Sequence, residues 1–591
     1  MRLELGDWLV IAAYFVFAAG IGFLFARRGG RSLADYFVSG RSLPWWLAGT
    51  SMVATTFAAD TPLAVAGMVA EHGVAGNWLW WNMVMSGMLT VFFYARLWRR
   101  AEVLTDAEFA EIRYAGRPAA FLRGFRALYL ALPINLIIMG WVNLAMVTIL
   151  SVTLGFDPWI SLFVLFIITA FYASLSGLWG VVVTDFVQFG IAMAGSITLA
   201  WFAVDAVGGI DGMKTGLVEH FGSTEAALRI LPPADSVWMP ALTFFVYLGV
   251  QWWAAWYPGA EPGGGGYIAQ RIFSCRTERE GVLATLWFNV AMYAIRPWPW
   301  ILVALASVIL YPGLDDPAAG YVRTMVDLLP SPIKGLLLAS FAAAYMSTIS
   351  TQLNWGASYL VNDLYLRFID PGASERRRVA ISRGATVLLF GLSAIVTMNL
   401  TSIEGAWKIL LAMGAGTGLV YILRWYWWRI NAWSELSAMA ASLVVSLALT
   451  QWYGLDAADP MEFAYLMLIT VAATTVVWVA VTFLTAPVTE ATLVAFYHRV
   501  RPGGIGWRRV ALEAGYGAER MAGGALNWTN WLAGVVAVYS ALFGVGRIIF
   551  GEMLIGVGLL GIAALAFTLI GRNMAQIENE VRPSTLAEEV V

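Results

Sequence analysis

A glutamate inside a broken apolar segment is the first sign of chemistry in this sequence. The stretch 257–267 holds two prolines, five glycines and Glu261, and apolar residues flank it on both sides. Proline lacks the amide proton of a helix and glycine costs about 1 kcal/mol relative to alanine, so a helix should stop here. A charge in irregular backbone at membrane depth typically marks a pathway for an ion or a solute. We interpret the stretch as half of a transport site; a cytoplasmic loop between two separate helices is the alternative.

A second acidic residue lies in a milder break of an earlier apolar segment. The stretch 54–62 contains Thr56, Asp60 and Thr61 and ends at Pro62. Pro62 removes one helical hydrogen bond and so frees carbonyl groups about one turn upstream. Freed carbonyls, hydroxyls and carboxylates are the ligands that hard cations prefer, and helices broken at membrane depth are typical of carriers.

The composition indicates a polytopic membrane protein. Of 591 residues, 60% are hydrophobic and 13% are charged, whereas soluble chains carry about 25% charged residues. Apolar runs of ~20 residues recur along the chain, as bilayer spans require. The net charge of −2 argues against nucleic acid as a partner. The single cysteine, Cys275, excludes an internal disulfide and a multi-cysteine metal site. The sequence also lacks the paired carboxylates or metal ligands that an intramembrane enzyme would need.

Fifteen apolar spans are expected, and arginine clusters orient them. The spans lie at about 7–26, 42–70, 77–98, 122–154, 158–176, 180–206, 238–272 (broken), 281–311, 333–362, 382–400, 403–427, 435–453, 462–486, 526–546 and 549–571. Arginine clusters follow only odd-numbered spans, at 27–41, 99–123, 271–279, 376–383, 424–429 and 499–509. Because arginine accumulates on the cytoplasmic side, we expect a multi-pass protein of the plasma (inner) membrane with its N-terminus outside and its C-terminus in the cytoplasm.

Four stretches, in the same order along the chain, resemble the sodium:solute symporter family, which includes sodium/glucose, sodium/proline and sodium/sialic acid carriers. They are 35–46 (DYFVSGRSLPWW) leading into 49–55 (GTSMVAT), 177–188 (GLWGVVVTDFVQ), 340–354 (SFAAAYMSTISTQLN) and 423–435 (LRWYWWRINAWSE). The resemblance covers roughly residues 1–485.

The resemblance implies an all-α membrane protein with a leucine-transporter-type core of two inverted five-helix repeats and about 15 transmembrane helices. The broken helices would be the first of each repeat. The expected parts are an extra N-terminal helix at 1–30, core repeats at 42–206 and 238–430, additional helices at 435–486, a cytoplasmic loop at 487–525, and a C-terminal helical hairpin and tail at 526–591.

The resemblance also implies one or two sodium ions as coupling ions. The family's shared sodium site uses carbonyls and hydroxyls, which correspond to Ala54, Phe57, Ala344, Ser347 and Thr348. The last three recur at helical spacing and share one face; taken alone, that face could equally serve close helix packing. Members that couple two ions add a second site, which corresponds to Asp185, Ser347, Ser350 and Thr351. Asp185 could instead be a charge that favours a helix N-terminus.

The substrate is expected between the two breaks, near the bilayer midplane. Candidate residues carry aromatic faces, amides, hydroxyls or carboxylates that suit a sugar, an amine or an acid. They are Thr56, Asp60, Thr61, Asn82, Gln251, Trp252, Trp253, Glu261 and Asn289. Sugar-carrying relatives have a glutamate and a lysine near the positions of Asn82 and Asn289, so the resemblance does not extend to galactose-like recognition. Arg296 could bind a carboxylate or pair with buried carbonyls or an acid.

We therefore expect a sodium-coupled secondary active symporter that imports a small polar organic solute (a sugar, amino acid or carboxylate) by alternating access and works as a monomer in the lipid bilayer. A proton-coupled carrier of the same fold, using Asp185 or Asp60, is the nearest alternative. A solute-sensing membrane protein with little transport is a further one.

Overall fold

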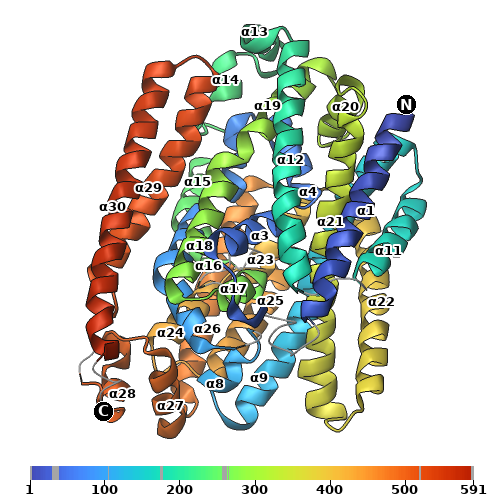
Figure 1. The fold of residues 1–591 in the computed structure, drawn as a ribbon. Coiled ribbons are helices and arrows are strands. Elements are labelled where there is room, and N and C mark those ends of the chain that lie inside the picture. Colours follow the sequence, from blue (N-terminus) through green and yellow to red (C-terminus); the bar gives the residue numbers. More distant parts are fainter. Residues whose placement is uncertain are drawn as a thin grey trace.

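The computed structural model describes residues 3–29, 39–103, 106–173, 178–255, 263, 265–517 and 521–586 as a bundle of long, roughly parallel helices (Figure 1). The two termini lie at opposite ends of the bundle, as an odd number of spans requires. Nine helices among the described residues are long and apolar enough to cross a membrane, or eleven if each bent pair counts as one span. Shorter apolar helices occur at three further expected spans: Leu5–Ala18, Pro158–Ile167 and Ala241–Ala254.

The first half of the chain supplies the helices around the first break. They are α1 (Leu5–Gly29), α3 (Trp45–Phe57), α4 (Asp60–His72), α5 (Trp78–Trp81), α6 (Val84–Leu89), η3 (Thr90–Tyr94), α7 (Ala95–Ala101), α8 (Phe109–Arg113), α9 (Gly116–Tyr129), η4 (Leu130–Ile134), α10 (Asn135–Leu154), α11 (Pro158–Ala173), α12 (Leu178–Ala206), α13 (Gly209–Phe221) and α14 (Thr224–Leu228). The 3–10 turns η1 (Ser39–Arg41) and η2 (Val74–Asn77) precede α3 and α5.

The second half begins with the other predicted break. Its helices are α15 (Ala241–Val246), η5 (Tyr247–Gln251), α16 (Trp252–Ala254), α17 (Gly266–Ser274), α18 (Glu278–Val290), η6 (Ala291–Ile295), α19 (Pro297–Leu310), α20 (Ala319–Leu328), α21 (Ile333–Ser358), η7 (Tyr359–Ile369), α22 (Glu375–Asn399), α23 (Ile403–Gly414), α24 (Gly418–Tyr426), α25 (Ala432–Gln451) and α26 (Pro460–Leu484). After them come α27 (Glu490–Val500), η8 (Ile505–Trp507), α28 (Arg508–Glu513), α29 (Gly524–Ile549) and α30 (Met553–Leu586).

Both predicted helix breaks are present. Helices α3 and α4 meet at a bend of 58°, and Ala58 between them has a φ of 30°, a conformation that is costly for a residue with a Cβ. In the second half, α16 ends at Ala254 and is followed by Ala255 in an extended conformation, and α17 begins at Gly266 after the extended Gly265. Glu261 lies outside the described residues, as does most of the predicted proline- and glycine-rich stretch.

A third break, which the sequence analysis did not predict, separates α23 from α24 with a bend of 49°. Gly416 at this bend has a φ of 88°, which favours glycine. Its amide donates a hydrogen bond of 3.0 Å to the carbonyl of Ala254, the last residue of α16. The third break thus satisfies a carbonyl that the second break leaves without a helical partner. The glycines at 414, 416 and 418 were the available signal.

Segments outside the two expected repeats are also packed against the core. The range 487–525, predicted as a cytoplasmic loop, contains the short helices α27 and α28, and α27 packs on α7 and α8. Its Trp507 is fully buried and donates to the carbonyl of Trp425 at 2.7 Å. Helices α29 and α30 form a hairpin along one side of the bundle (Figure 1), where α29 packs on α6, η3 and η6.

The contact between the second and third breaks allows no side chain at Gly418. A Cβ at this position would lie 2.0 Å from the carbonyl oxygen of Trp253, and relieving such overlap typically costs about 1–3 kcal/mol or more. We expect Gly418→Ala to lower the thermal denaturation midpoint of the purified protein. Gly249→Ala is the matched control, because nothing lies within 4 Å of a Cβ there and alanine favours helix. Equal midpoints for the two variants would contradict the packing of the two breaks.

Candidate functional site

The break after α3 leaves several backbone carbonyls available for other partners. The last four carbonyls of a helix have no intrahelical partner, and in α3 these belong to residues 54–57. The carbonyl of Thr55 accepts from the Thr348 hydroxyl at 3.2 Å, and that of Thr56 accepts from the Thr61 hydroxyl at 3.1 Å. Ala54 and Phe57, the two predicted carbonyl ligands, belong to this same turn, and their side chains are buried.

Helix α21 presents its hydroxyls to this turn. It packs on α3 and α12, and Ser347 and Thr348 are both buried on it. Thr348 reaches the end of α3, whereas the Ser347 hydroxyl donates to Oδ1 of Asp185 at 2.8 Å. Ala344, one helical turn earlier, is also buried. The structure therefore brings together the α3 and α21 residues that the family resemblance assigns to the first sodium site.

Asp185 of α12 is a fully buried carboxylate with several partners. Besides Ser347, it accepts from the hydroxyl of Ser51 on α3 at 2.6 Å. The guanidinium of Arg271 on α17 interacts with it electrostatically, and its Nε lies 3.4 Å from the Ser51 hydroxyl. Asp185 thus links α12, α3, α21 and the helix that follows the second break. Because the partners of Asp185 come from three neighbouring helices, its environment is more than that of a charge at a helix N-terminus.

The remaining residues of the predicted second site also lie on α21. The Ser350 hydroxyl donates to the carbonyl of Ser347 at 3.2 Å and is buried. Thr351 is partly buried one residue further along. Ser347 is therefore the residue that joins the two predicted sodium sites, since it belongs to the first set and directly contacts Asp185 of the second.

A cavity opens beside the first break. It holds about 510 Å³ of space between atoms, open solvent included. Its walls come from α3, α4, α5, α10, α17, η6, α21 and α23, and from residues next to them. The lining residues are Thr55, Thr56, Ala58, Asp60, Thr61, Trp80, Ile138, Trp141, Val142, Tyr267, Met292, Arg296, Thr348, Gln352 and Trp407.

Two opposite charges line this cavity. Asp60, in the first turn of α4, accepts a hydrogen bond from the Trp141 side chain and interacts electrostatically with Arg296. Nη1 of Arg296 donates to the carbonyl of Val53 and to the hydroxyl of Thr56, both at 3.3 Å. The Arg296 guanidinium also lies over the ring of Trp300 at 5.0 Å. Arg296 therefore pairs with a buried carbonyl at the end of α3, one of the two roles that the sequence left open, and also lines the cavity.

Three of the nine predicted substrate residues, Thr56, Asp60 and Thr61, line the cavity. Asn82 and Gln251 do not line it: the Gln251 amide nitrogen lies 3.2 Å from the carbonyl of Leu79 and 3.4 Å from the amide oxygen of Asn82. The Asn82 amide is further used on the carbonyls of Trp78 and Leu79. These two amides satisfy the interrupted backbone between α5 and α6.

The other predicted substrate residues also lie outside the cavity lining or outside the described residues. Trp252 stacks on Trp531 of α29, with ring centroids 5.6 Å apart. Trp253 donates to the carbonyl of Gly249 within its own helix. Asn289 is buried against Gly87 of α6 and donates to the carbonyl of Thr285. Glu261 lies outside the described residues.

The aromatic wall of the cavity was not among the residues predicted from the sequence. Trp80, Trp141, Trp407 and Tyr267 all line the cavity, and they come from four different helices. Among 29 tryptophans, neither spacing nor neighbouring residues distinguish these three from those that pack in the core. Tyr267 was the last residue of the predicted broken stretch, and its position beside the break was the one available signal.

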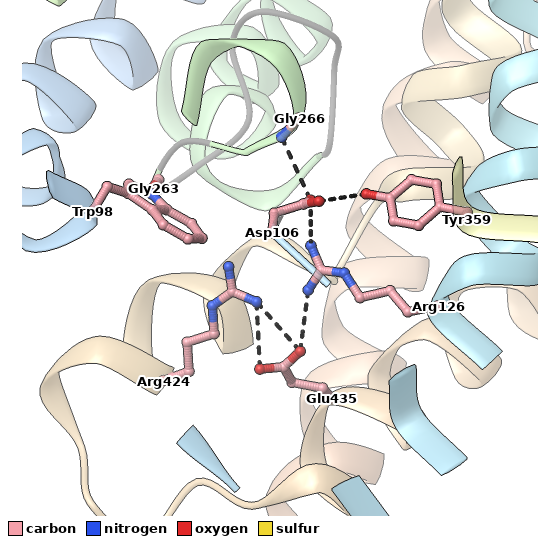
Figure 2. Close-up of polar contacts among 8 residues, drawn as sticks. All are labelled: Trp98, Asp106, Arg126, Gly263, Gly266, Tyr359, Arg424 and Glu435. Atoms are coloured by element: carbon pink, nitrogen blue, oxygen red, sulfur yellow. Dashed lines mark hydrogen bonds and ion pairs between the residues drawn. The ribbon is translucent and has the colours of Figure 1, made fainter. Parts of the chain in front are cut away.

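Figure 2 shows a cluster of buried charges that come from α9, α24, α25 and the segment before α8. We call Asp106, Arg126, Arg424 and Glu435 the charge cluster. Arg126 contacts Asp106 at 3.4 Å and Glu435 at 3.3 Å, and Arg424 contacts Glu435 at 3.4 Å. All four side chains are at most 3% exposed. Buried charges require such pairing, because an isolated ion loses its hydration without compensation.

The charge cluster reaches the start of α17, directly after the second break. The amide of Gly266 points to Oδ2 of Asp106 at 3.5 Å, and the Tyr359 hydroxyl donates to Oδ1 (Figure 2). A carboxylate at a helix N-terminus is favoured by the helix dipole. On the other side, the indole of Trp98 donates to the carbonyl of Gly263 at 2.5 Å. Asp106 therefore binds the first residue of α17, and Trp98 binds Gly263 shortly before it.

Comparison with known proteins places these features in a family. A family model described as the sodium:solute symporter family matches residues 36–444. A sodium/glucose cotransporter of Vibrio parahaemolyticus is 25% identical over 469 residues, which cover 75% of this chain and 84% of that protein. Sodium/myo-inositol cotransporter 2 of Homo sapiens is 23% identical over 484 residues, covering 75% of this chain and 70% of that protein.

A solved structure shows the same fold. It is that of a Na⁺-coupled sialic acid symporter in a substrate-bound outward-open state, with a TM-score of 0.64 and 20% sequence identity, and the match covers 82% of this chain and 99% of that one. The expected all-helical, leucine-transporter-type fold is confirmed.

The charge cluster generates a stability prediction. Glu435→Gln removes the carboxylate that two buried arginines share, and breaking a buried ion pair from one side costs about 3–5 kcal/mol. We expect a clear fall in the thermal denaturation midpoint of the detergent-purified protein. The matched control is Glu513→Gln, which removes an ion pair with Arg509 that is 60% exposed and worth at most about 1 kcal/mol. An equal change in the denaturation midpoint of both variants would show that the charge cluster does not stabilise the folded protein.

Proposed function

Because this chain belongs to the sodium:solute symporter family, we propose that it imports a small polar organic solute by alternating access, with sodium as the coupling ion. It is a transporter and not an enzyme. We further propose that it works as a monomer in the plasma (inner) membrane, with its N-terminus outside and its C-terminus in the cytoplasm. The arginine clusters that follow the odd-numbered spans support this orientation.

The main support for this proposal is that the cavity and the predicted sodium site have residues in common. Thr55 and Thr348 line the cavity, and the same two residues are hydrogen-bonded across the predicted first sodium site. A sodium ion held there would therefore be a close neighbour of a solute in the cavity. Binding of either ligand would restrain the same turn of α3, which is the physical basis for one ligand raising the affinity of the other.

In the proposed first site, sodium is held by the carbonyls of Ala54, Phe57 and Ala344 and by the hydroxyls of Ser347 and Thr348. The chemistry of this set fits a hard monovalent cation, because all five donors are oxygens. The α3 carbonyls lie at a helix end, where no intrahelical amide competes for them. Sodium would thereby join the broken helix α3–α4 to α21 and favour the conformation that binds solute.

A second site is proposed at Asp185, with Ser347, Ser350 and Thr351. Its carboxylate already contacts Ser347 at 2.8 Å, so the two sites would share a residue. The number of ions decides the available driving force. One charge crossing 100 mV supplies ~2.3 kcal/mol, and a tenfold gradient adds about 1.4 kcal/mol. One ion therefore supports accumulation of roughly a few hundred-fold, and two ions roughly 10⁵-fold.

Alternating access needs a closure that can open on the cytoplasmic side. We propose that the charge cluster is that closure, because it joins α9, α24 and α25 to the first residue of α17 through Asp106. Its contacts are ion pairs and hydrogen bonds between separate helices. Such contacts can exchange protein partners for water when the helices separate, whereas tightly interdigitated apolar packing would resist that separation.

The first sodium site predicts a specific loss. Thr348→Ala removes one oxygen ligand, and a hydrogen-bonding or ligand contact to a charged group contributes about 1.5–3 kcal/mol. We expect the sodium concentration for half-maximal uptake into proteoliposomes to rise about ten- to hundredfold. Thr153→Ala is the matched control, since its hydroxyl is buried in α10 and bonds only to the carbonyl of Ile149 in its own helix. Unchanged sodium dependence in Thr348→Ala would refute the site.

The second site predicts a change in stoichiometry. If Asp185 holds a second ion, the native protein shows a sodium Hill coefficient near two and Asp185→Asn lowers it to one. A sodium Hill coefficient of one in the native protein, with one charge moved per turnover, would refute the second site. Uptake in sodium-free buffer at acidic pH would instead favour proton coupling through Asp185 or Asp60.

A further inference from the structure

The cavity beside the first break has a carboxyl group and a guanidinium group on its walls. Asp60 and Arg296 both line it, on α4 and at the start of α19 respectively. We propose that the transported solute is a small zwitterion, with a cationic nitrogen that faces Asp60 and a carboxylate that faces Arg296, as in amino acids and betaines. This inference rests on the proposed function, since it assigns the substrate class of the same cavity.

The negative side of the cavity is built for a cation. Asp60 is 5% exposed, so its carboxylate is largely withdrawn from water, and in such surroundings a complementary charge is worth far more than at a surface. The Trp141 side chain and the amides of Asp60 and Thr61 donate to it, which orients the carboxyl group and leaves part of its capacity of about four acceptor sites for a solute.

The aromatic wall strengthens the same preference. Trp80, Trp141, Trp407 and Tyr267 surround the cavity together with Asp60. Trp80 is held by stacking on Tyr293, with ring centroids 5.5 Å apart, and Trp141 meets Trp407 edge to face at 6.5 Å. Aromatic faces attract cations, and sets of several rings are the usual site for quaternary ammonium groups. A neutral polyol would gain little from four aromatic neighbours beyond stacking on one of them.

The positive side suits a carboxylate. Arg296 has a planar guanidinium with five donors, and two contacts of Nη1, to Val53 and Thr56, fix the group against the end of α3. A fixed guanidinium binds carboxylates with strong, oriented hydrogen bonds. Thr55, Thr56 and Thr348 line the cavity together with Arg296. The carboxylate would therefore lie next to the proposed sodium site, and the ion would attract it as well.

Charge balance separates a zwitterion from other solutes. Asp60 and Arg296 compensate one another electrostatically. A cationic solute would add a second positive charge beside the proposed sodium ion, and an anionic solute would place an apolar group against the Asp60 carboxyl; either is costly in a buried site. A zwitterion complements both walls and leaves the net charge of the cavity unchanged.

Three solutes of one shape and different charge test this inference. Glycine betaine carries both charges, 3,3-dimethylbutanoate replaces its nitrogen by carbon and keeps only the carboxylate, and choline keeps only the cation. Each is measured by thermal shift on the purified full chain, with sodium and with potassium, beside proline, glucose and myo-inositol. We expect sodium-dependent stabilisation by glycine betaine or proline, and at least tenfold weaker binding of the other four solutes.

Variants extend the test to the named residues. Asp60→Asn should weaken zwitterion binding about tenfold or more while leaving 3,3-dimethylbutanoate unaffected or improved. Asp7→Asn is the control: this carboxyl is also buried, accepts from the amide of Gly335 at 2.9 Å and is not among the residues that line the cavity. Zwitterion binding in Asp7→Asn should match that of the native protein.

The outcomes separate the inference from the proposed function. Sodium-dependent stabilisation by glucose, myo-inositol or 3,3-dimethylbutanoate, with none by zwitterions, overturns the substrate class and keeps the symporter. Stabilisation by zwitterions that is the same in sodium and potassium supports the substrate class and overturns sodium coupling. Failure of every zwitterion to stabilise the protein overturns the inference, as does unchanged zwitterion binding in Asp60→Asn.

Discussion

The need to satisfy backbone polar groups inside an apolar medium is the constraint on which this structure depends. A helix that breaks at membrane depth exposes carbonyl and amide groups that lipid cannot satisfy. At the first break, threonine hydroxyls from α4 and α21 reach the carbonyls of Thr56 and Thr55. At the second and third breaks, the amide of Gly416 reaches the carbonyl of Ala254. An ion, a solute or a moving helix can take the place of each of these hydrogen-bond donors.

The same constraint explains the unusual use of amides and indoles in the helices around the cavity. Asn82 and Gln251 serve the interruption between α5 and α6. From the C-terminal hairpin, Trp531 donates to the carbonyl of Met85 and Tyr539 donates to that of Trp81. Trp80, which lines the cavity, lies in this interrupted segment. The hairpin therefore supports a wall of the cavity from the outside, although it lies beyond the region that matches the family.

Three groups of buried charges link separate helices around the cavity, the predicted ion sites and the second break. Asp185 and Arg271 join α12 to α17, Asp60 and Arg296 both line the cavity and interact electrostatically, and the charge cluster joins α9, α24 and α25. Because buried ion pairs contribute less to stability than apolar packing of the same volume, their value here is in orientation: each pair is satisfied in one arrangement of the helices and incomplete in others.

Local sequence was enough to predict the class of protein, most of its apolar helices and its first two breaks. Apolar runs, Pro62 and the glycine run act within a few residues, so their effect on a helix does not depend on the rest of the fold. Family resemblance added the set Ala54, Phe57, Ala344, Ser347 and Thr348, which the packing of α3 on α21 brings together.

Only the tertiary structure decided which polar and aromatic residues reach the cavity. Asp60 and Arg296 line the same cavity although more than two hundred residues separate them in the sequence. Trp80, Trp141 and Trp407 come from three separate helices. Asn82 and Gln251 look equally suited to a solute in the sequence but are used on backbone carbonyls. The rotation of each helix about its axis makes that choice, and it is set by packing against neighbours that are distant in the chain.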